Sequence, residues 1–247
     1  MVGELFDPHA ELLIHHRLRP HWSQAGAIVF MTFRAKDSIP ADVISRWDRD
    51  KQEWVERALA QSPGPLSIPT SPVHVSTETI ANTPGMDQRV IHDGMHWSML
   101  IRLLTEERRH EFTVHFNRCR ETKLDECHGE CLLKHPDLAQ IVHDSLLYFD
   151  GVRYRMGDFV VMPNHVHLLA SFPTQQMMEG HSASWLRYTS RAINRRLGRT
   201  GQFWQQEPFD HLVRSVEQYA YLRSYIARNP EKAGLKPGEY LYRRYPG

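Results

Sequence analysis

The stretch that decides the fold is VRYRMGDFVVM-PN-HVHLLASF, residues 152–172. Its two outer segments, 152–162 and 165–172, are rich in β-branched, aromatic and aliphatic residues, as is typical of buried strands. Pro163 and Asn164 between them have turn chemistry. We therefore expect the two strands to pair as an antiparallel hairpin.

Further strands and helices are predicted on both sides of this hairpin. Apolar spacing, capping residues, prolines and glycines predict a strand at 26–33, helices at 40–61, 96–117, 136–151 and 184–197, a strand at 209–213, and a last helix from Ser215 that Pro230 ends. This order predicts an α+β fold of the ferredoxin-like type, in which helices pack on an antiparallel sheet.

We expect residues 1–247 to form a single domain with one interruption. Between about residues 61 and 95 the sequence becomes rich in proline, serine and threonine and shows no sustained periodicity. Such composition indicates a mobile or inserted segment.

Composition excludes several classes of protein. The chain has 247 residues, of which 41% are hydrophobic and 24% charged, which argues against a disordered tail, a fibre or a membrane channel. Its three cysteines argue against a secreted disulfide scaffold. The start of the sequence lacks the pattern of a signal peptide, and no long apolar run is present, so a cytoplasmic location without membrane contact is expected.

Charge is distributed unevenly along the chain. Residues 184–247 contain 12 Lys and Arg against 5 Asp and Glu, whereas residues 1–183 contain 18 against 24. Ten of the 12 cations are arginines, whose planar guanidinium pairs well with phosphate. A surface for a polyanion is one interpretation of this segment, and a solvated helix face is the other.

The second strand of the hairpin carries a pair of histidines. His165 and His167 are two residues apart, so both side chains project from one face of the strand, while Val166 and Leu168 project from the other. Two imidazoles on one face could bind one metal ion or make hydrogen bonds at a sheet surface. A zinc hydrolase is disfavoured because the sequence has no H-x-H-x-D-H run.

The last predicted helix places Tyr225 and Asn229 four residues apart, on one helical face. A phenol has a pKa of about 10, so it attacks a phosphodiester only if a cation polarises the phosphate or a base removes the proton. An amide oxygen one turn away could complete a metal site with the histidines. The alternative is a half-buried aromatic residue, like Tyr219 and Tyr221.

Three motifs together resemble the REP-associated tyrosine transposases of the single-tyrosine HUH superfamily. They are MPNHVHLL, SWLRYTSRAINRRLGRTGQFWQQEPFDHLVR and YLRSYIARNPEKAGL, and AIVFMTFRAKDSIP and CHGECLLKHPDLAQIVHDSLLYFDGVRY are also similar to the family's longer-chain branch. The similarity covers roughly residues 26–60 and 125–235. It implies the HUH nuclease type of fold.

The resemblance also implies an activity and its residues. His165 and His167 match the pair that holds a divalent cation, Mg²⁺ or Mn²⁺, and Asn229 lies where relatives supply an amide ligand. Tyr225 matches the nucleophile of a single-stranded DNA endonuclease and strand transferase that forms a 5′-phosphotyrosine intermediate on hairpin DNA. Relatives include both monomers and homodimers, so the oligomeric state is left open.

Under this resemblance the basic segment is a candidate DNA-binding surface. Its predicted phosphate contacts are Arg187, Arg191, Arg195, Arg196 and Arg199. Trp204 and Phe203 could stack on an unpaired base, and core packing is an equally good interpretation of both.

Two other functions compete with the strand transferase. One is a protein of the same fold that binds hairpin DNA without cutting it, and the other is a metal-dependent phosphohydrolase that uses water, for which the motif supplies no general base. A small zinc site at Cys119, Cys127, His128 and Cys131 is disfavoured by its C-x3-C spacing, and local packing is preferred.

Overall fold

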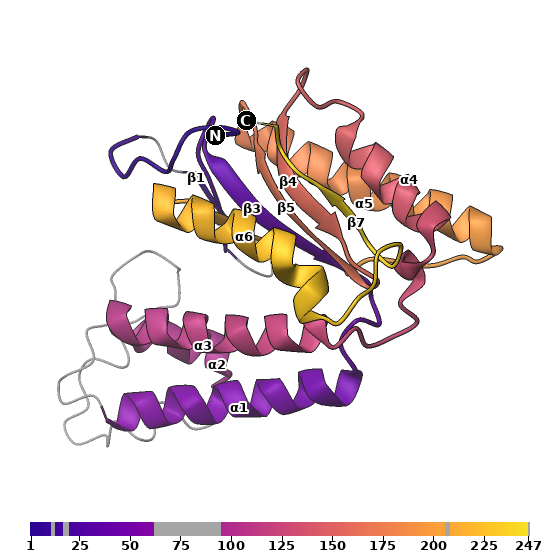
Figure 1. Ribbon diagram of the computed structural model, residues 1–247. Helices are drawn as coiled ribbons and strands as arrows, with labels where there is room; N and C mark the ends of the chain where they lie inside the picture. Colours follow the sequence, from indigo (N-terminus) through magenta and orange to yellow (C-terminus); the bar gives the residue numbers. More distant parts are fainter. Residues whose placement is uncertain (11–12, 17–19, 62–94, 206–207, 247) are drawn as a thin grey trace, which may run out of the picture. The chain divides into compact units, whose positions relative to one another are not determined.

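The computed structural model describes residues 1–10, 13–16, 20–61, 95–205 and 208–246 (Figure 1). It divides into two compact units, one formed by residues 1–40 and 123–247 and the other by residues 41–122. Most of the predicted interruption at 61–95 lies outside the described residues, and the single domain across 1–247 stays a prediction. Each unit is considered below by itself.

The larger unit is built on a five-stranded antiparallel sheet. The strand order is β6-β3-β5-β4-β7, and every neighbouring pair is antiparallel. The strands are β3 (Ile28–Arg34), β4 (Arg155–Val161), β5 (His165–Ser171), β6 (Phe209–Leu212) and β7 (Leu241–Arg243). A separate hairpin pairs β1 (Leu13–His16) with β2 (Pro20–Ser23).

The first four strands of this sheet have the ferredoxin-like arrangement. Across the sheet these four strands stand in the order β6-β3-β5-β4, so the fourth strand in the chain is followed by the first, the third and the second. The predicted hairpin is confirmed as β4–β5, with the turn at Pro163 and Asn164. The α+β class and the antiparallel sheet predicted from the sequence are therefore confirmed.

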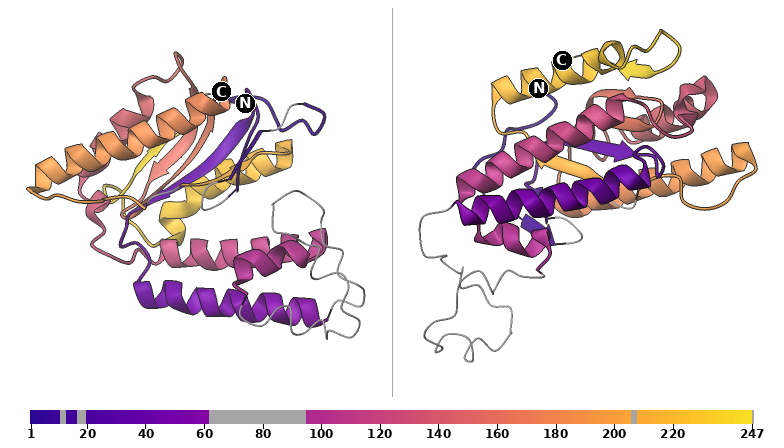
Figure 2. Two further views of the ribbon diagram at one scale, coloured as in Figure 1. Left: turned by 180° about the vertical axis from the view of Figure 1, so that it is seen from behind. Right: turned by 90° about the horizontal axis from the view of Figure 1, so that it is seen from below.

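Helices cover both faces of the sheet (Figures 1 and 2). On one face α4 (Pro136–Leu147) and α5 (Gln175–Leu197) pack against side chains such as Phe33 and Leu168. On the other face α6 (Val216–Lys232) packs against side chains such as Phe30 and Leu169. Side chains that alternate along a strand thus enter two different cores.

Three helix ends in the larger unit differ from the prediction, and one of them is the end of α4 at Leu147 rather than at Gly151. Helix α5 begins at Gln175 rather than Ser184, because Thr174 caps it by accepting a hydrogen bond of 3.2 Å from the backbone N–H of Met177. Helix α6 continues past Pro230 to Lys232. A proline in the last turn removes one helical hydrogen bond, and the packed helix tolerates that loss.

The smaller unit contains the helices α1 (Ala41–Ala60), α2 (Trp97–Leu100) and most of α3 (Glu106–Asp125), with a 3₁₀ turn at Ile101–Leu103. Its core includes Val55, Leu100 and Phe112. The single helix predicted at 96–117 is wrong, because Leu104 is extended and Thr105 caps the start of α3 through the N–H of Arg108. No helix in the described ranges is long and apolar enough to cross a bilayer.

Candidate active site

Strand β5 carries both histidines to the sheet face that α6 covers. His165 and His167 are fully buried, and their ring centroids lie 4.6 Å apart. Val166 and Leu168 enter the core on the opposite face, beneath α4 and α5. The predicted placement of the two imidazoles on one face is therefore observed.

The tautomer of His165 is fixed by Asn164. The Asn164 side chain donates from Nδ2 to the carbonyl of His128 over 2.8 Å, and its Oδ1 lies 2.7 Å from His165 Nδ1. A backbone carbonyl only accepts hydrogen bonds, so the amide oxygen must face the imidazole and Nδ1 must donate. Nε2 of His165 therefore presents a lone pair.

That lone pair is buried and unused. Nε2 of His165 has no hydrogen-bond partner among the described residues. Burial lowers the pKa of His165 to about 3, and the side chain of Asn229 opposes this shift. The imidazole is consequently neutral at physiological pH, as a metal ligand must be.

The two imidazole nitrogens of His167 face Thr32 and Tyr225. Thr32 lies directly across on β3, and its Oγ1 is 2.9 Å from His167 Nδ1. The phenol oxygen of Tyr225 is 3.3 Å from His167 Nε2. Phe30 stacks on the imidazole with 5.4 Å between centroids, which holds the ring in place.

Helix α6 brings the phenol and an amide to the same place. Ser215 caps the helix by accepting from the N–H of Gln218 over 3.1 Å, and Ile226 anchors it in the core. Tyr225 is half-buried, with its ring 5.2 Å from that of His167, and Asn229 is fully buried. The predicted common face of Tyr225 and Asn229 thus points at the paired histidines.

Only one of the two polar atoms of the Asn229 amide makes a hydrogen bond within the described residues. Its Nδ2 donates to Oδ1 of Asp125 over 3.3 Å. Its Oδ1 is buried and has no hydrogen-bond partner in the described part of the chain. A buried acceptor without a partner is unfavourable by about 1–3 kcal/mol.

These atoms form a plausible ligand set for a divalent cation. Two imidazole nitrogens and one amide oxygen are neutral donors that leave other coordination positions for phosphate oxygens and water. A cation would supply the missing partner of His165 Nε2 and Asn229 Oδ1. No group of three or more His, Cys, Asp or Glu side chains suited to a metal occurs in the described ranges.

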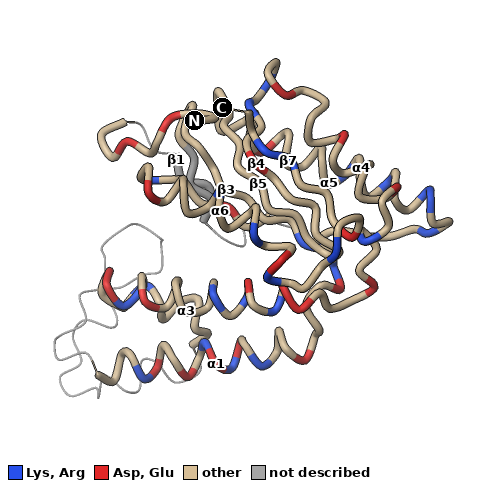
Figure 3. The backbone as a smooth tube through the Cα atoms, in the orientation of Figure 1, with Lys and Arg blue, Asp and Glu red and all other residues tan. Residues whose placement is uncertain are grey.

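The predicted arginine contacts do not line this site. Arg187, Arg191 and Arg195 are exposed on α5. Helix α5 covers the side of the sheet opposite α6 (Figure 3). Arg196 forms an ion pair with Asp137, and Arg199 forms one with Glu130. The last two arginines therefore already have carboxylate partners.

The predicted base-stacking role of Trp204 is wrong, because this residue belongs to the core. Trp204 is 3% exposed and donates from Nε1 to Thr189 Oγ1 over 2.8 Å. Its ring lies edge-on to Phe33 and Phe203, and Phe203 is also buried. Core packing is the interpretation that the structure supports for both aromatics.

We expect Trp204→Ala to lower the free energy of unfolding by about 3–5 kcal/mol, since it removes a large buried side chain and its hydrogen bond to Thr189 Oγ1. Urea unfolding followed by circular dichroism measures this loss. Tyr188→Ala is the control, because Tyr188 is 59% exposed on α5. Equal stability of the two variants would contradict the assignment of Trp204 to the core.

Three residues around the site were missed by the sequence analysis: Thr32, Asp125 and Asn164. Asn164 was assigned only to a turn, although it precedes the histidine pair directly. Thr32 could have been identified from the sequence, because it is a polar residue in an otherwise apolar strand, and the structure shows that it is buried. Asp125 carried no local signal, since its contact with Asn229 spans 104 residues.

The cysteine-containing segment makes local contacts. The thiol of Cys131 donates to the carbonyl of Cys127 over 2.7 Å, and both residues have positive φ angles. Hydrogen bonding and burial raise the pKa of Cys127. These contacts agree with the preferred interpretation of local packing.

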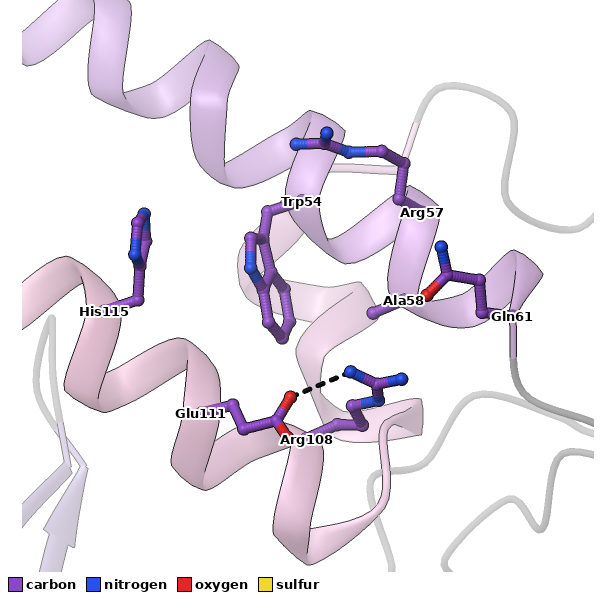
Figure 4. A pocket seen from close by; sticks show the side chains of 7 residues that line it. All are labelled: Trp54, Arg57, Ala58, Gln61, Arg108, Glu111 and His115. Atoms are coloured by element: carbon purple, nitrogen blue, oxygen red, sulfur yellow. Dashed lines mark hydrogen bonds and ion pairs between the residues drawn. The ribbon is translucent and has the colours of Figure 1, made fainter.

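The smaller unit contains a pocket of about 330 Å³ between α1 and α3 (Figure 4). Trp54, Arg57 and His115 line it, together with the Arg108–Glu111 ion pair of 2.9 Å. None of the predicted site residues lies in this pocket. The residues predicted for the site all belong to the larger unit.

No protein-family model and no curated protein matches the chain. One solved structure to which it is similar is that of a REP-associated tyrosine transposase bound to a REP hairpin. The sequences are 22% identical, the TM-score is 0.33, and the match covers 40% of this chain. It spans 59% of the chain of that transposase.

Proposed function

We propose that this chain is a metal-dependent endonuclease and strand transferase that acts on single-stranded DNA and forms a 5′-phosphotyrosine intermediate. One observation carries the proposal: the phenol of Tyr225 lies 3.3 Å from His167 Nε2, in a site where the buried His165 Nε2 and Asn229 Oδ1 have no hydrogen-bond partner within the described residues. The motifs that resemble the REP-associated tyrosine transposases support the same activity.

In this proposal His165 and His167 give their Nε2 lone pairs to a divalent cation, Mg²⁺ or Mn²⁺, and Asn229 gives Oδ1. Asn164 and Thr32 keep the two imidazoles in the orientation and tautomer that present Nε2. When bound, the cation would polarise the phosphodiester and offset its negative charge. The neutral ligands leave that positive charge undiminished for the DNA.

The oxygen of Tyr225 attacks the phosphorus of the DNA backbone. A bond forms between this oxygen and phosphorus, and the bond from phosphorus to the 3′ oxygen breaks. The phenol loses one proton and the leaving 3′ oxygen gains one, so the step is balanced. The new ester keeps the phosphodiester energy, and attack by another 3′ hydroxyl rejoins DNA without a nucleotide cofactor.

The test uses a single-stranded oligonucleotide that carries a palindromic hairpin with a short unpaired flank. With Mg²⁺ or Mn²⁺, we expect a label at the 3′ end to become covalently attached to the protein and a label at the 5′ end to appear on a released fragment. EDTA is expected to prevent both. Tight binding of the hairpin without any adduct would favour the alternative, a protein that binds hairpin DNA and does not cut it.

The arginines of α5 give a separate prediction about DNA binding. A strand that contacts both α5 and the Tyr225 site must pass around an edge of the sheet. We expect Arg191→Ala combined with Arg195→Ala to weaken binding and to reduce the slope of log affinity against log salt by about 1.4, at about 0.7 per phosphate contact. Binding is measured by fluorescence anisotropy across a salt series.

The matched control replaces two exposed arginines near the start of β4, Arg153 and Arg155, with alanine. These two residues are outside the predicted DNA surface, so we expect the control to keep the wild-type slope. If the Arg191→Ala, Arg195→Ala variant keeps the same slope as the wild type and the control, the arginines of α5 make no phosphate contacts.

A further inference from the structure

A third residue shares the helical face of Tyr225 and Asn229. Lys232 lies three residues after Asn229, and its ammonium group is 5.8 Å from the centroid of the Tyr225 ring. Lys232 and Asn229 both contact Asp125, the last residue of α3. The carboxylate therefore connects two neighbouring side chains of α6.

The two oxygens of Asp125 have different partners. Oδ1 accepts from Asn229 Nδ2 over 3.3 Å, and Oδ2 is 2.5 Å from the ammonium group of Lys232. The side chain of Asp125 is 8% exposed, whereas that of Lys232 is 55% exposed. The exposed Lys232 thus forms an ion pair with the buried carboxylate of Asp125. The same carboxylate accepts a hydrogen bond from the buried amide of Asn229.

The contact with Asp125 decides which end of the amide faces the histidines. A carboxylate can only accept hydrogen bonds, so the Asn229 amide must turn its NH₂ group toward Asp125. Its oxygen then faces away from Asp125, as the buried acceptor for which the described residues supply no partner. In the flipped orientation the NH₂ group would occupy the place of the oxygen, and an NH₂ group cannot bind a cation.

We propose that Asp125 is a positioning residue that orients Asn229 so that its Oδ1 can bind the cation, an inference that rests on the proposed function. Asn164 has the corresponding relation to His165, where the carbonyl of His128 selects the orientation of an amide. Partners of this kind affect metal affinity through the ligand they hold, without touching the metal.

The test measures Mn²⁺ affinity by isothermal titration calorimetry, in the absence of DNA, for the wild type, Asp125→Ala, Asn229→Ala and the double variant. We expect Asp125→Ala to weaken Mn²⁺ binding by about 10- to 100-fold. If Asp125 acts through Asn229, the double variant binds Mn²⁺ no more weakly than Asn229→Ala alone. Asp137→Ala is the control, because Asp137 pairs with Arg196 away from the site.

Asp125→Asn is a second variant, which removes the same negative charge as Asp125→Ala but changes the side-chain volume far less. Its side-chain carbonyl can still accept from Asn229, so we expect a loss of affinity between those of the wild type and Asp125→Ala. Thermal unfolding of each variant shows that it is folded at the titration temperature. If Asp125→Ala does not fold, Mn²⁺ binding by Asp125→Asn that is weaker than that of the wild type supports the inference, and wild-type affinity overturns it.

The outcomes separate this inference from the proposed function. Unchanged Mn²⁺ affinity in Asp125→Ala, with weakened binding in Asn229→Ala, would overturn the role of Asp125 alone. Losses that add in the double variant would also overturn it, because Asp125 would then act independently of Asn229. If the wild type bound no Mn²⁺, the proposed function itself would fail.

Discussion

Tyr225→Phe is expected to form no covalent adduct with single-stranded hairpin DNA, whereas the wild type forms one in the presence of Mg²⁺ or Mn²⁺. The substitution removes the attacking oxygen and the 3.3 Å contact with His167 Nε2 while the ring keeps its place against Phe30 and His167. Denaturing gel electrophoresis with a label at the 3′ end of the DNA measures the adduct, and anisotropy measures binding, which we expect to persist.

Tyr221→Phe is the matched control for this experiment. Tyr221 is on the same helix, its ring stacks on Tyr225 at 6.4 Å, and it is 65% exposed. We expect this variant to form the adduct at the wild-type level. An adduct that persisted in Tyr225→Phe would transfer the role of nucleophile to Tyr219 or Tyr221.

His165→Ala is expected to remove both cleavage and tight cation binding. The substitution deletes the buried Nε2 lone pair and leaves Oδ1 of Asn164 without its donor. We expect Mn²⁺ affinity to fall by more than about 100-fold, because losing a ligand exceeds the effect of losing an outer partner. Calorimetry measures the affinity, and the gel assay measures cleavage at saturating Mn²⁺.

His143→Ala controls for the loss of an imidazole as such. His143 lies on α4, where its Nδ1 is 3.1 Å from Asp144 and its ring lies 5.3 Å from that of Phe159, on the sheet face opposite α6. We expect this variant to bind Mn²⁺ and cleave DNA like the wild type. A folded His165→Ala variant with unchanged cleavage would refute the metal assignment.

Local patterns in the sequence were sufficient to predict most of the fold. The hairpin was predictable because apolar strands flank the turn residues Pro163 and Asn164, and the antiparallel ferredoxin-like sheet followed from the order of the elements. The starts and ends of helices were less predictable. Packing extends α6 past Pro230, which local spacing does not encode, whereas the cap at Thr174 that begins α5 is a local signal that the apolar spacing of 184–197 did not include.

The candidate site was predictable only in part. The spacing of His165 and His167 placed both on one face, and the resemblance added Tyr225 and Asn229. That these residues meet depends on the packing of α6 over β5, which brings together groups 58 residues apart. The place of Trp204 could not be predicted, because an aromatic residue that stacks on a base and one that packs in the core look the same in the local sequence.

The most direct test of the central claim locates the covalent bond. The wild-type adduct is digested with trypsin and nuclease, and mass spectrometry identifies the modified peptide. Tyr225 lies in the tryptic peptide 224–228, whereas Tyr219 and Tyr221 lie in 215–223. We expect a nucleotide joined through phosphate to Tyr225. A modification on 215–223, or on any other peptide, would contradict the role of Tyr225 as the nucleophile.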